Sequence, residues 1–258
     1  MNNDEELSIL KKFIQFPLNN EKEIVEMFTS LPGAIHKKGK HPREEFVFIR
    51  GTRADRVTLV AHCDTVFGLK AEHKIAIKDG KIISEEGDCG IGADDRAGCA
   101  MLWLLRDSGH NILICNGEEP GNEKGSYFLI NKHPKIAKEI QESSFMLSFD
   151  RRNANNFITY RIPVSDDFKA YLGTEVGLTE DTTGGWTDIV ALSSQTIAKD
   201  CCCAANISVG YYDAHKYFDL HGKSEYLIIE EWLNAYHKYK AFLEKPQKRF
   251  VNVEKMEI

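Results

Sequence analysis

Five short segments of this 258-residue sequence carry acidic or imidazole side chains that could bind metal ions. In chain order they are His62-Cys63-Asp64, Asp94-Asp95, Glu118-Glu119, Asp150 and His215. Imidazole nitrogen and carboxylate oxygen are both ligands that zinc accepts in proteins. Each segment follows a predicted strand or begins a predicted helix, so the informative feature is the five in this order rather than any one of them.

Taken alone, each segment has a simpler interpretation. Asp94 would cap a helix after a glycine-rich loop, because a carboxylate is stabilised at a helix N-terminus. A pair of glutamates such as Glu118-Glu119 is usually a solvated surface. Asp150 could pair with a neighbouring arginine, and His215 could be structural. The carboxylate of Asp64 could orient His62 by accepting its second ring N–H, or could be a turn residue.

Taken together, the segments predict a site for two cations. They would bring four carboxylates together, and two like charges about 4 Å apart repel by roughly 4 kcal/mol at an effective dielectric near 20. Two divalent ions bridged by Asp94 would relieve this repulsion. Zinc is expected, with cobalt or manganese as substitutes. Such ions lower the pKa of a shared water from about 15.7 to about 7. Of the two glutamates, one could bind metal while the other removes a proton from that water.

Strands and helices alternate along the chain, which predicts an α/β fold with a mostly parallel central sheet sandwiched by helices. Ligands of such sheets gather at the carboxyl ends of the strands, where three of the five segments lie. The predicted strands are 45–50, 56–61, 111–115, 145–149, 156–160 and 206–209, with a hairpin at 73–84. The predicted helices are 4–16, 21–29, 94–105, 124–141 (interrupted near Pro134), 166–174, 186–193 and 224–243.

Composition narrows the class of protein. Hydrophobic residues make up 42% and charged residues 28% of the chain, as in globular domains. The net charge of -6 argues against a nucleic-acid surface, and no apolar run could span a membrane. The N-terminus lacks an apolar signal region, and the seven cysteines are odd in number, so we expect a cytoplasmic protein with free thiols. We expect a single domain over residues 1–258, with Cys201-Cys202-Cys203 packed in the core.

The sequences around the five segments resemble those of one enzyme superfamily. They are LVAHCDTVF, GIGADDRAG, NGEEPGNEKGS, LSFDRR and ISVGYYDAHKYFD, and they span most of the chain. In this order they are similar to the co-catalytic di-zinc exopeptidases, a superfamily of aminopeptidases, carboxypeptidases and N-acyl amino acid deacylases.

The resemblance implies a role for each residue. Asp94 would bridge the two metals, with a cis peptide bond after it. His62 and Asp150 would complete one metal site, and Glu119 and His215 the other. Glu118 would be the general base. The resemblance also implies that Asp64 orients His62 and that Asp219 orients His215.

The spacing departs from some branches of that superfamily. Only 65 positions separate Asp150 from His215 and only 30 separate Asp64 from Asp94, which leaves no room for an inserted lid or dimerisation domain. We therefore expect the catalytic domain alone, and the oligomeric state stays open.

Substrate contacts are less determined by the sequence. The loop 182–188 could form a wall of the site that ends at Asp188, or a glycine hinge in front of a helix. Arg151 could bind a substrate carboxylate. The expected activity is that of a zinc metallopeptidase, an aminopeptidase or dipeptidase acting on a small peptide. The alternatives are an N-acyl amino acid deacylase on the same site, a single-zinc acyltransferase of the glutaminyl-cyclase type, and a binding module without activity.

Overall fold

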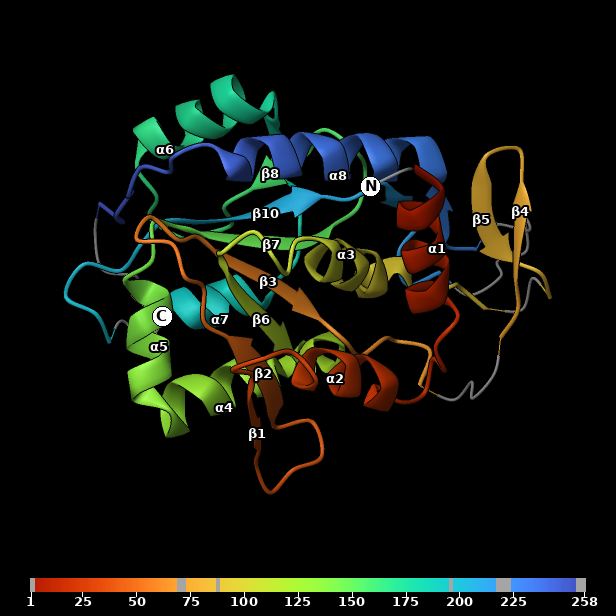
Figure 1. Ribbon diagram of the computed structural model, residues 1–258, viewed down its shortest axis with the longest axis horizontal. Helices are drawn as coiled ribbons and strands as arrows, with labels where there is room; N and C mark the ends of the chain where they lie inside the picture. The colour runs from red at the N-terminus through yellow and green to blue at the C-terminus, as the bar shows by residue number, and fades with distance from the viewer. Residues whose placement is uncertain (1–2, 69–72, 87–88, 195–196, 217–223, 254–258) are drawn as a thin grey trace.

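A computed structural model describes residues 3–68, 73–86, 89–194, 197–216 and 224–253 of the chain (Figure 1). Its central feature is a sheet of eight strands, whose four middle members run parallel: β6 (Asn111–Cys115), β3 (Thr58–His62), β7 (Met146–Arg151) and β10 (Ala204–Ser208). Three of these strands are buried along their whole length, as expected when helices cover both faces of a parallel sheet.

Shorter strands extend this sheet at both edges. On the β6 side lie β2 (Glu45–Ile49) and β1 (Ile35–Lys38), both antiparallel to their neighbours. On the β10 side lie β8 (Asn156–Ile158), antiparallel to β10, and then β9 (Thr179–Glu180), parallel to β8. The prediction of a mostly parallel sheet is confirmed by its centre, and the antiparallel pairs are confined to its edges.

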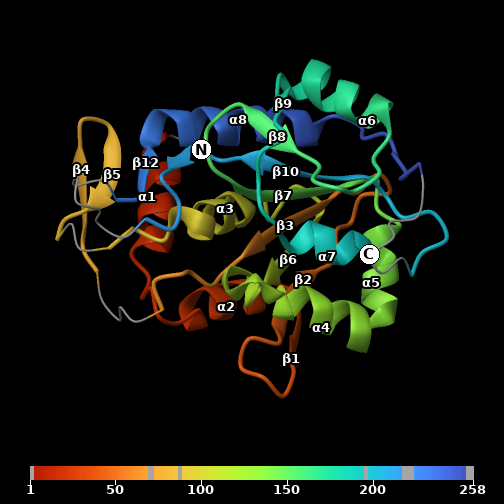
Figure 2. The same ribbon diagram turned by 180° about the vertical axis from the view of Figure 1, so that it is seen from behind.

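Helices cover both faces of the sheet (Figures 1 and 2). One face carries α1 (Asn3–Ile14), α3 (Ala93–Leu104) and α8 (Ile229–Glu244), and α2 (Lys22–Thr29) joins them through edge-to-face rings of Phe28 and Trp103 at 5.6 Å. The other face carries α4 (Lys124–Lys132), α5 (Pro134–Gln141) and α7 (Asp188–Ser194). A short helix α6 (Asp166–Tyr171), with a wider turn after it at Leu172–Val176, packs near the end of α8.

A second, smaller sheet lies beside the first and was not predicted. It consists of β4 (Ile75–Lys78), β5 (Lys81–Ser84), β12 (Tyr226–Ile228) and β11 (Tyr211–Tyr212), all paired antiparallel. The predicted hairpin at 73–84 is confirmed, and Asp79 and Gly80 both have the positive φ that its tight turn requires. No local pattern predicts that residues 226–228 pair with this hairpin or that residues 211–212 pair with 226–228.

The prediction of one helix over 224–243 is therefore wrong at its start. Residues 226–228 form strand β12, because their backbone pairs with β5 and β11, and helix α8 begins only at Ile229. The apolar spacing of Trp232, Tyr236 and Tyr239 does face the core as expected.

All seven cysteines are free, as predicted, and all are buried. Cys201-Cys202-Cys203 lie in the interior just before β10, as expected. Within the described part of the chain, no helix is both long enough and apolar enough to cross a membrane.

Candidate metal centre

The parallel strands bring three of the five segments to one edge of the sheet. His62 is the last residue of β3, and it is level with Cys115 at the end of β6, so Glu118-Glu119 follow in the next turn. Asp150 lies near the end of β7 on the other side of β3. Neighbouring parallel strands end at the same edge, which is the local reason why these residues meet.

Asp94 enters the same site from the first turn of α3. Gly92 has a left-handed backbone (φ 66°), and the peptide bond between Asp94 and Asp95 is cis, as the resemblance implied. The interpretation of Asp94 as a helix cap is wrong, because its carboxylate oxygens face His62 and His215 and the residue at the N-cap position is Gly92. Asp95 takes that role instead, with its Oδ1 accepting from the N–H of Gly98 at 3.1 Å.

The two carboxylate oxygens of Asp94 face different partners. Oδ1 lies 3.3 Å from Nε2 of His62, and Oδ2 lies 3.1 Å from Nε2 of His215. Asp94 therefore stands between two groups of donors, one on each oxygen.

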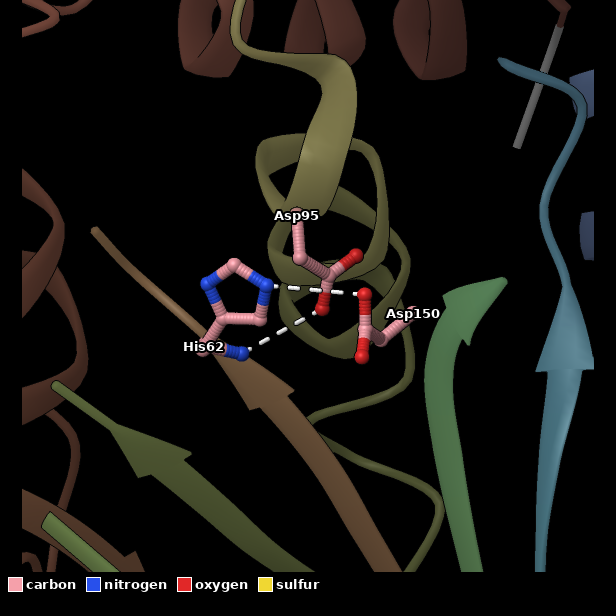
Figure 3. Close-up of side chains that lie close together, drawn as sticks. All are labelled: His62, Asp95 and Asp150. Carbon is pink, nitrogen blue, oxygen red and sulfur yellow. Dashed lines mark hydrogen bonds and ion pairs between the residues drawn. The ribbon is translucent and has the colours of Figure 1, made fainter. Parts of the chain in front are cut away.

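His62, Asp94 and Asp150 form the first group. Nε2 of His62 lies 3.5 Å from Oδ1 of Asp150, and all three side chains are buried. Figure 3 shows His62 facing both Asp150 and Asp95; Oδ2 of Asp95 accepts the backbone N–H of His62 at 3.2 Å. Both oxygens of Asp95 thus bind backbone N–H groups, whereas those of Asp94 face the two imidazoles.

His215, Glu119 and Asp94 form the second group. Nε2 of His215 lies 3.1 Å from Oε2 of Glu119, the same distance as to Asp94. The other carboxylate oxygen of Glu119 is buried without a hydrogen-bond partner. Asp219, which the resemblance implied would orient His215, lies outside the described residues.

Glu118 lies beside the first group but farther from His62 than Asp94 and Asp150. Its Oε2 is 3.9 Å from Nε2 of His62, and its side chain lines the cavity above the site. Its position therefore differs from that of Glu119, whose oxygen lies close to an imidazole.

Asp64 holds this turn in place from behind. Its Oδ1 accepts the backbone N–H groups of Gly117 and Glu118 at 2.8 and 3.1 Å, and its Oδ2 accepts that of Glu119 at 3.2 Å. Nδ1 of His62 lies 3.1 Å from the backbone carbonyl of Asp64 and 3.5 Å from its carboxylate. Asp64 thus meets His62 mainly through its main chain, while its carboxylate fixes the Glu118-Glu119 turn.

The protonation behaviour of the site reflects an excess of negative charge. Burial raises the pKa of Glu119 to about 7 and that of Asp150 to about 6, and in both cases the charge of Asp94 adds to the rise. Burial also raises the pKa of Glu118 well above its usual value. Hydrogen bonds to Asp94 and Glu119 raise the pKa of His215 to about 11. Every one of these shifts favours added positive charge in the site.

The donor set fits divalent metal ions. Ligands at about 2.0–2.1 Å around a tetrahedral zinc are separated from each other by roughly 3.3 Å. The separations of 3.1–3.5 Å between the imidazole and carboxylate atoms match this spacing. Potential ligand atoms of His62, Asp95 and Asp150, and of His62, Asp94 and Glu119, lie within 4.8 Å of one another. The unpartnered oxygen of Glu119 is a further free acceptor.

Two predicted substrate contacts have other partners in the structure. Arg151 is buried and binds Asn156 at 2.7 Å, Asp181 at 2.5 Å and the carbonyl of Thr183 at 3.0 Å, so it holds the loop that follows Asp181. Asp188 is only 1% exposed, and its carboxylate accepts a hydrogen bond from Ser126.

The cavity over the site is small. Its volume is about 330 Å³, and its lining includes Asp94, Glu118, Asp150, His215 and the exposed Arg152. It shares Tyr160 and residues 184–186 with an adjoining cavity of about 620 Å³. A larger cavity of about 730 Å³ lies between α2 and strands β1 and β2, away from the candidate ligands.

Sequence reasoning missed several residues that support the site. Oγ1 of Thr187 donates to Oδ2 of Asp150 at 2.7 Å, and the amide of Asn206 binds the carbonyl of the same aspartate at 3.2 Å. Glu225 binds the loop before Asp94. Thr187 sits beside Asp188 in a loop that the sequence singled out, but nothing local distinguishes Asn206 or Glu225 from other polar residues.

No protein-family model matches this sequence, and no curated protein matches it. Solved structures do share its fold. The aminopeptidase PepT from Bacillus cereus aligns over 95% of this chain and 98% of its own, with a TM-score of 0.67 and 15% identity. A tripeptidase from Staphylococcus aureus aligns over the same shares with a TM-score of 0.64 and 14% identity. The Pyrococcus horikoshii TET1 peptidase aligns over 93% and 98%, with a TM-score of 0.59 and 14% identity.

These three neighbours are peptidases, and at such low identity the likeness establishes the fold. The expected α/β fold with a mostly parallel central sheet between helices is thereby confirmed, and these peptidases share it. Within the described residues, no inserted lid domain is evident.

Proposed function

We propose that this protein is a metal-dependent exopeptidase that hydrolyses small peptides, with aminopeptidase activity as the first expectation. The observation that carries the proposal is the division of Asp94 between two imidazole–carboxylate groups, one on each oxygen. A carboxylate placed in this way suits two metal ions better than one. The names of two proteins that share the fold, an aminopeptidase and a tripeptidase, support the choice of substrate.

Each donor group would hold one ion, zinc being the ion expected for imidazole and carboxylate ligands, with cobalt or manganese as substitutes. His62 and Asp150 would bind the first, His215 and Glu119 the second, and Asp94 both. When bound, such ions lower the pKa of a shared water and polarise the scissile carbonyl. Asp64 keeps the Glu118-Glu119 turn in place through its three backbone hydrogen bonds.

Glu118 is the proposed general base. Its carboxylate lines the cavity and lies farther from His62 than the carboxylates of Asp94 and Asp150 do. It accepts the proton of the attacking water and then delivers that proton to the nitrogen of the leaving amine. Burial raises the pKa of Glu118, which makes its carboxylate a stronger proton acceptor.

The cavity favours a short substrate. About 330 Å³ is at the lower end of the range of ligand pockets, and the adjoining cavity offers room for residues beyond the scissile bond. The acidic wall around Asp94 and Glu118 would attract a free amino terminus. Arg152 has no hydrogen bond or ion pair to another described residue, so its guanidinium could meet a substrate carboxylate.

Elemental analysis combined with a substrate panel tests the proposal. We expect two metal ions per chain, loss of activity after chelation, and recovery with zinc or cobalt. The panel compares dipeptides and tripeptides with free termini against their N-acetylated and C-amidated forms. Preference for the N-acetylated forms would instead indicate a deacylase. One ion per chain without peptide hydrolysis would favour the single-zinc acyltransferase.

The assignment of His215 has a test of its own. The histidine nearest to His215 in the sequence is His221, which lies outside the described residues. We expect His215→Ala to lose one of the two ions and His221→Ala to keep both. The opposite result would show that His215 is not the ligand, while leaving the two-metal proposal intact.

A further inference from the structure

Glu225 is a buried carboxylate directly behind the Asp94 loop. Its Oε2 accepts the backbone N–H groups of Ile91, Gly92 and Ala93 at 2.9, 2.6 and 3.2 Å, and its Oε1 accepts that of Asp94 at 3.1 Å. The side chain has no exposed surface. One carboxylate thus binds four successive backbone donors from a segment more than 130 positions earlier in the chain.

The local backbone explains why the four donors point to one side. Left-handed Gly92 turns the chain just before α3, and successive N–H groups in such a turn form a concavity that binds anions. The dipole at the start of the helix favours a negative charge at the same place. Gly90 leaves the space for it, because a Cβ there would lie 2.8 Å from Oε2 of Glu225.

This arrangement leaves the side chain of Asp94 available. The carboxylate of an aspartate at a helix start ordinarily caps the helix by accepting a backbone N–H. Here Glu225 and Asp95 bind the backbone donors, so both oxygens of Asp94 face the imidazoles of His62 and His215.

Glu225 also connects this loop to the strands that lead to His215. It lies just before β12, whose residues pair with β11 and β5. β11 ends at Tyr212, three residues before His215. The carboxylate therefore joins the segment that carries one donor group to the segment that carries the shared aspartate.

We propose that Glu225 is a positioning residue, which fixes Asp94 relative to His215 so that one carboxylate can serve both metal ions. This role rests on the proposed two-metal function. Burying a carboxylate is costly unless it is hydrogen-bonded, and here the four backbone N–H groups of the Asp94 loop supply those hydrogen bonds.

Glu225→Gln is the informative variant because it removes only one of the four hydrogen bonds. An amide in the same place can keep its oxygen on the three donors of Ile91, Gly92 and Ala93. Its NH2 group then faces the N–H of Asp94, two donors that cannot bind each other. Glu225→Ala removes both acceptor oxygens and therefore all four hydrogen bonds. Glu230→Gln, at an exposed position in the first turn of α8, is the matched control for loss of one negative charge.

The assay titrates the metal-free proteins with Co²⁺ alone and follows its visible absorption, without turnover. Partners of metal ligands typically change metal affinity 10- to 100-fold when they are replaced. We expect a loss of that size in Glu225→Gln together with an altered Co²⁺ spectrum, and wild-type behaviour in Glu230→Gln. Amide hydrogen exchange should show faster exchange at Ile91–Asp94 in Glu225→Ala, and thermal unfolding monitors whether each variant folds.

The outcomes separate this role from the proposed function. If wild-type protein binds two Co²⁺ ions and Glu225→Gln binds them equally well with the same spectrum, the positioning role is wrong although the two-metal site stands. Lower thermal stability with unchanged Co²⁺ binding would likewise show that Glu225 has a structural role and no positioning role. If the wild-type protein binds no Co²⁺, the proposed function itself fails, and the positioning role fails with it.

Discussion

Replacing Asp64 by asparagine tests how the site is held together. The carboxylate of Asp64 is fully buried, with Gly117 and Glu118 donating to one oxygen and Glu119 to the other. In Asp64→Asn, the amide oxygen can keep the first two hydrogen bonds. The NH2 group then faces the N–H of Glu119 and the guanidinium of Arg43, which lies 3.6 Å from Oδ2 in the wild-type protein.

The expected magnitude follows from that geometry. The opposite amide orientation would lose two hydrogen bonds rather than one, so the first orientation should prevail. A hydrogen bond to a charged group contributes about 1.5–3 kcal/mol, so the free energy of unfolding of the metal-free variant should be about 2–3 kcal/mol lower than that of the wild-type protein. Because the N–H left without an acceptor belongs to Glu119, metal affinity or activity should also fall by about 10- to 100-fold.

Urea unfolding of the metal-free protein and metal titration of the folded protein measure the two effects separately. Asp107→Asn is the control, since Asp107 is 87% exposed and the same change in charge should be nearly neutral there. The reasoning would be refuted if Asp64→Asn unfolded at the same urea concentration as Asp107→Asn and retained wild-type metal affinity.

Three further predictions follow from other contacts. Glu118→Gln should keep both metal ions but lose activity about 10²- to 10⁴-fold, as measured by elemental analysis and initial rates; a parental rate would exclude Glu118 as the base. Thr187→Val removes the 2.7 Å hydrogen bond to Asp150 and should weaken metal binding about tenfold in a chelator competition, which an unchanged affinity would contradict. The hydrogen bond from Arg53 holds the pKa of Asp55 at about 2, below its ordinary 3.8, so its stabilising effect is present above pH 4 and is lost as the pH falls towards 2. Between pH 4 and pH 2, the free energy of unfolding should therefore fall by about 1 kcal/mol less in Asp55→Asn than in the wild-type protein, after allowance for solvent screening. Urea unfolding measures this difference, and identical pH profiles would contradict it.

Much of the fold could be predicted because its signals are local. Buried runs such as 111–115 form strands as expected, and Pro134 divides the stretch 124–141 into two helices. The second sheet could not be predicted, because β11 and β12 have two and three residues and owe their strand geometry to pairing with a distant hairpin. The same pairing explains why residues 226–228 do not continue α8.

The candidate site could likewise be predicted only in part. The five segments could be found because each ends a strand or begins a helix, where side chains meet at one edge of the sheet. The contacts that orient them could not be found, since Thr187, Asn206 and Glu225 are ordinary polar residues in sequence. The resemblance also implied that Asp64 orients His62, and the shorter contact between them is to the carbonyl of Asp64 rather than to its carboxylate.

The sequence by itself determined which chemical groups this protein has and at which strand ends they lie. Those properties depend on residue type and on short-range periodicity, and both are local properties of the sequence. Only the tertiary structure decided that Asp94 faces one imidazole with each oxygen and that Glu225 takes over the backbone donors of its loop. Such contacts join residues far apart in sequence, and their geometry is set by the packing of the whole sheet and its helices, which no local pattern records.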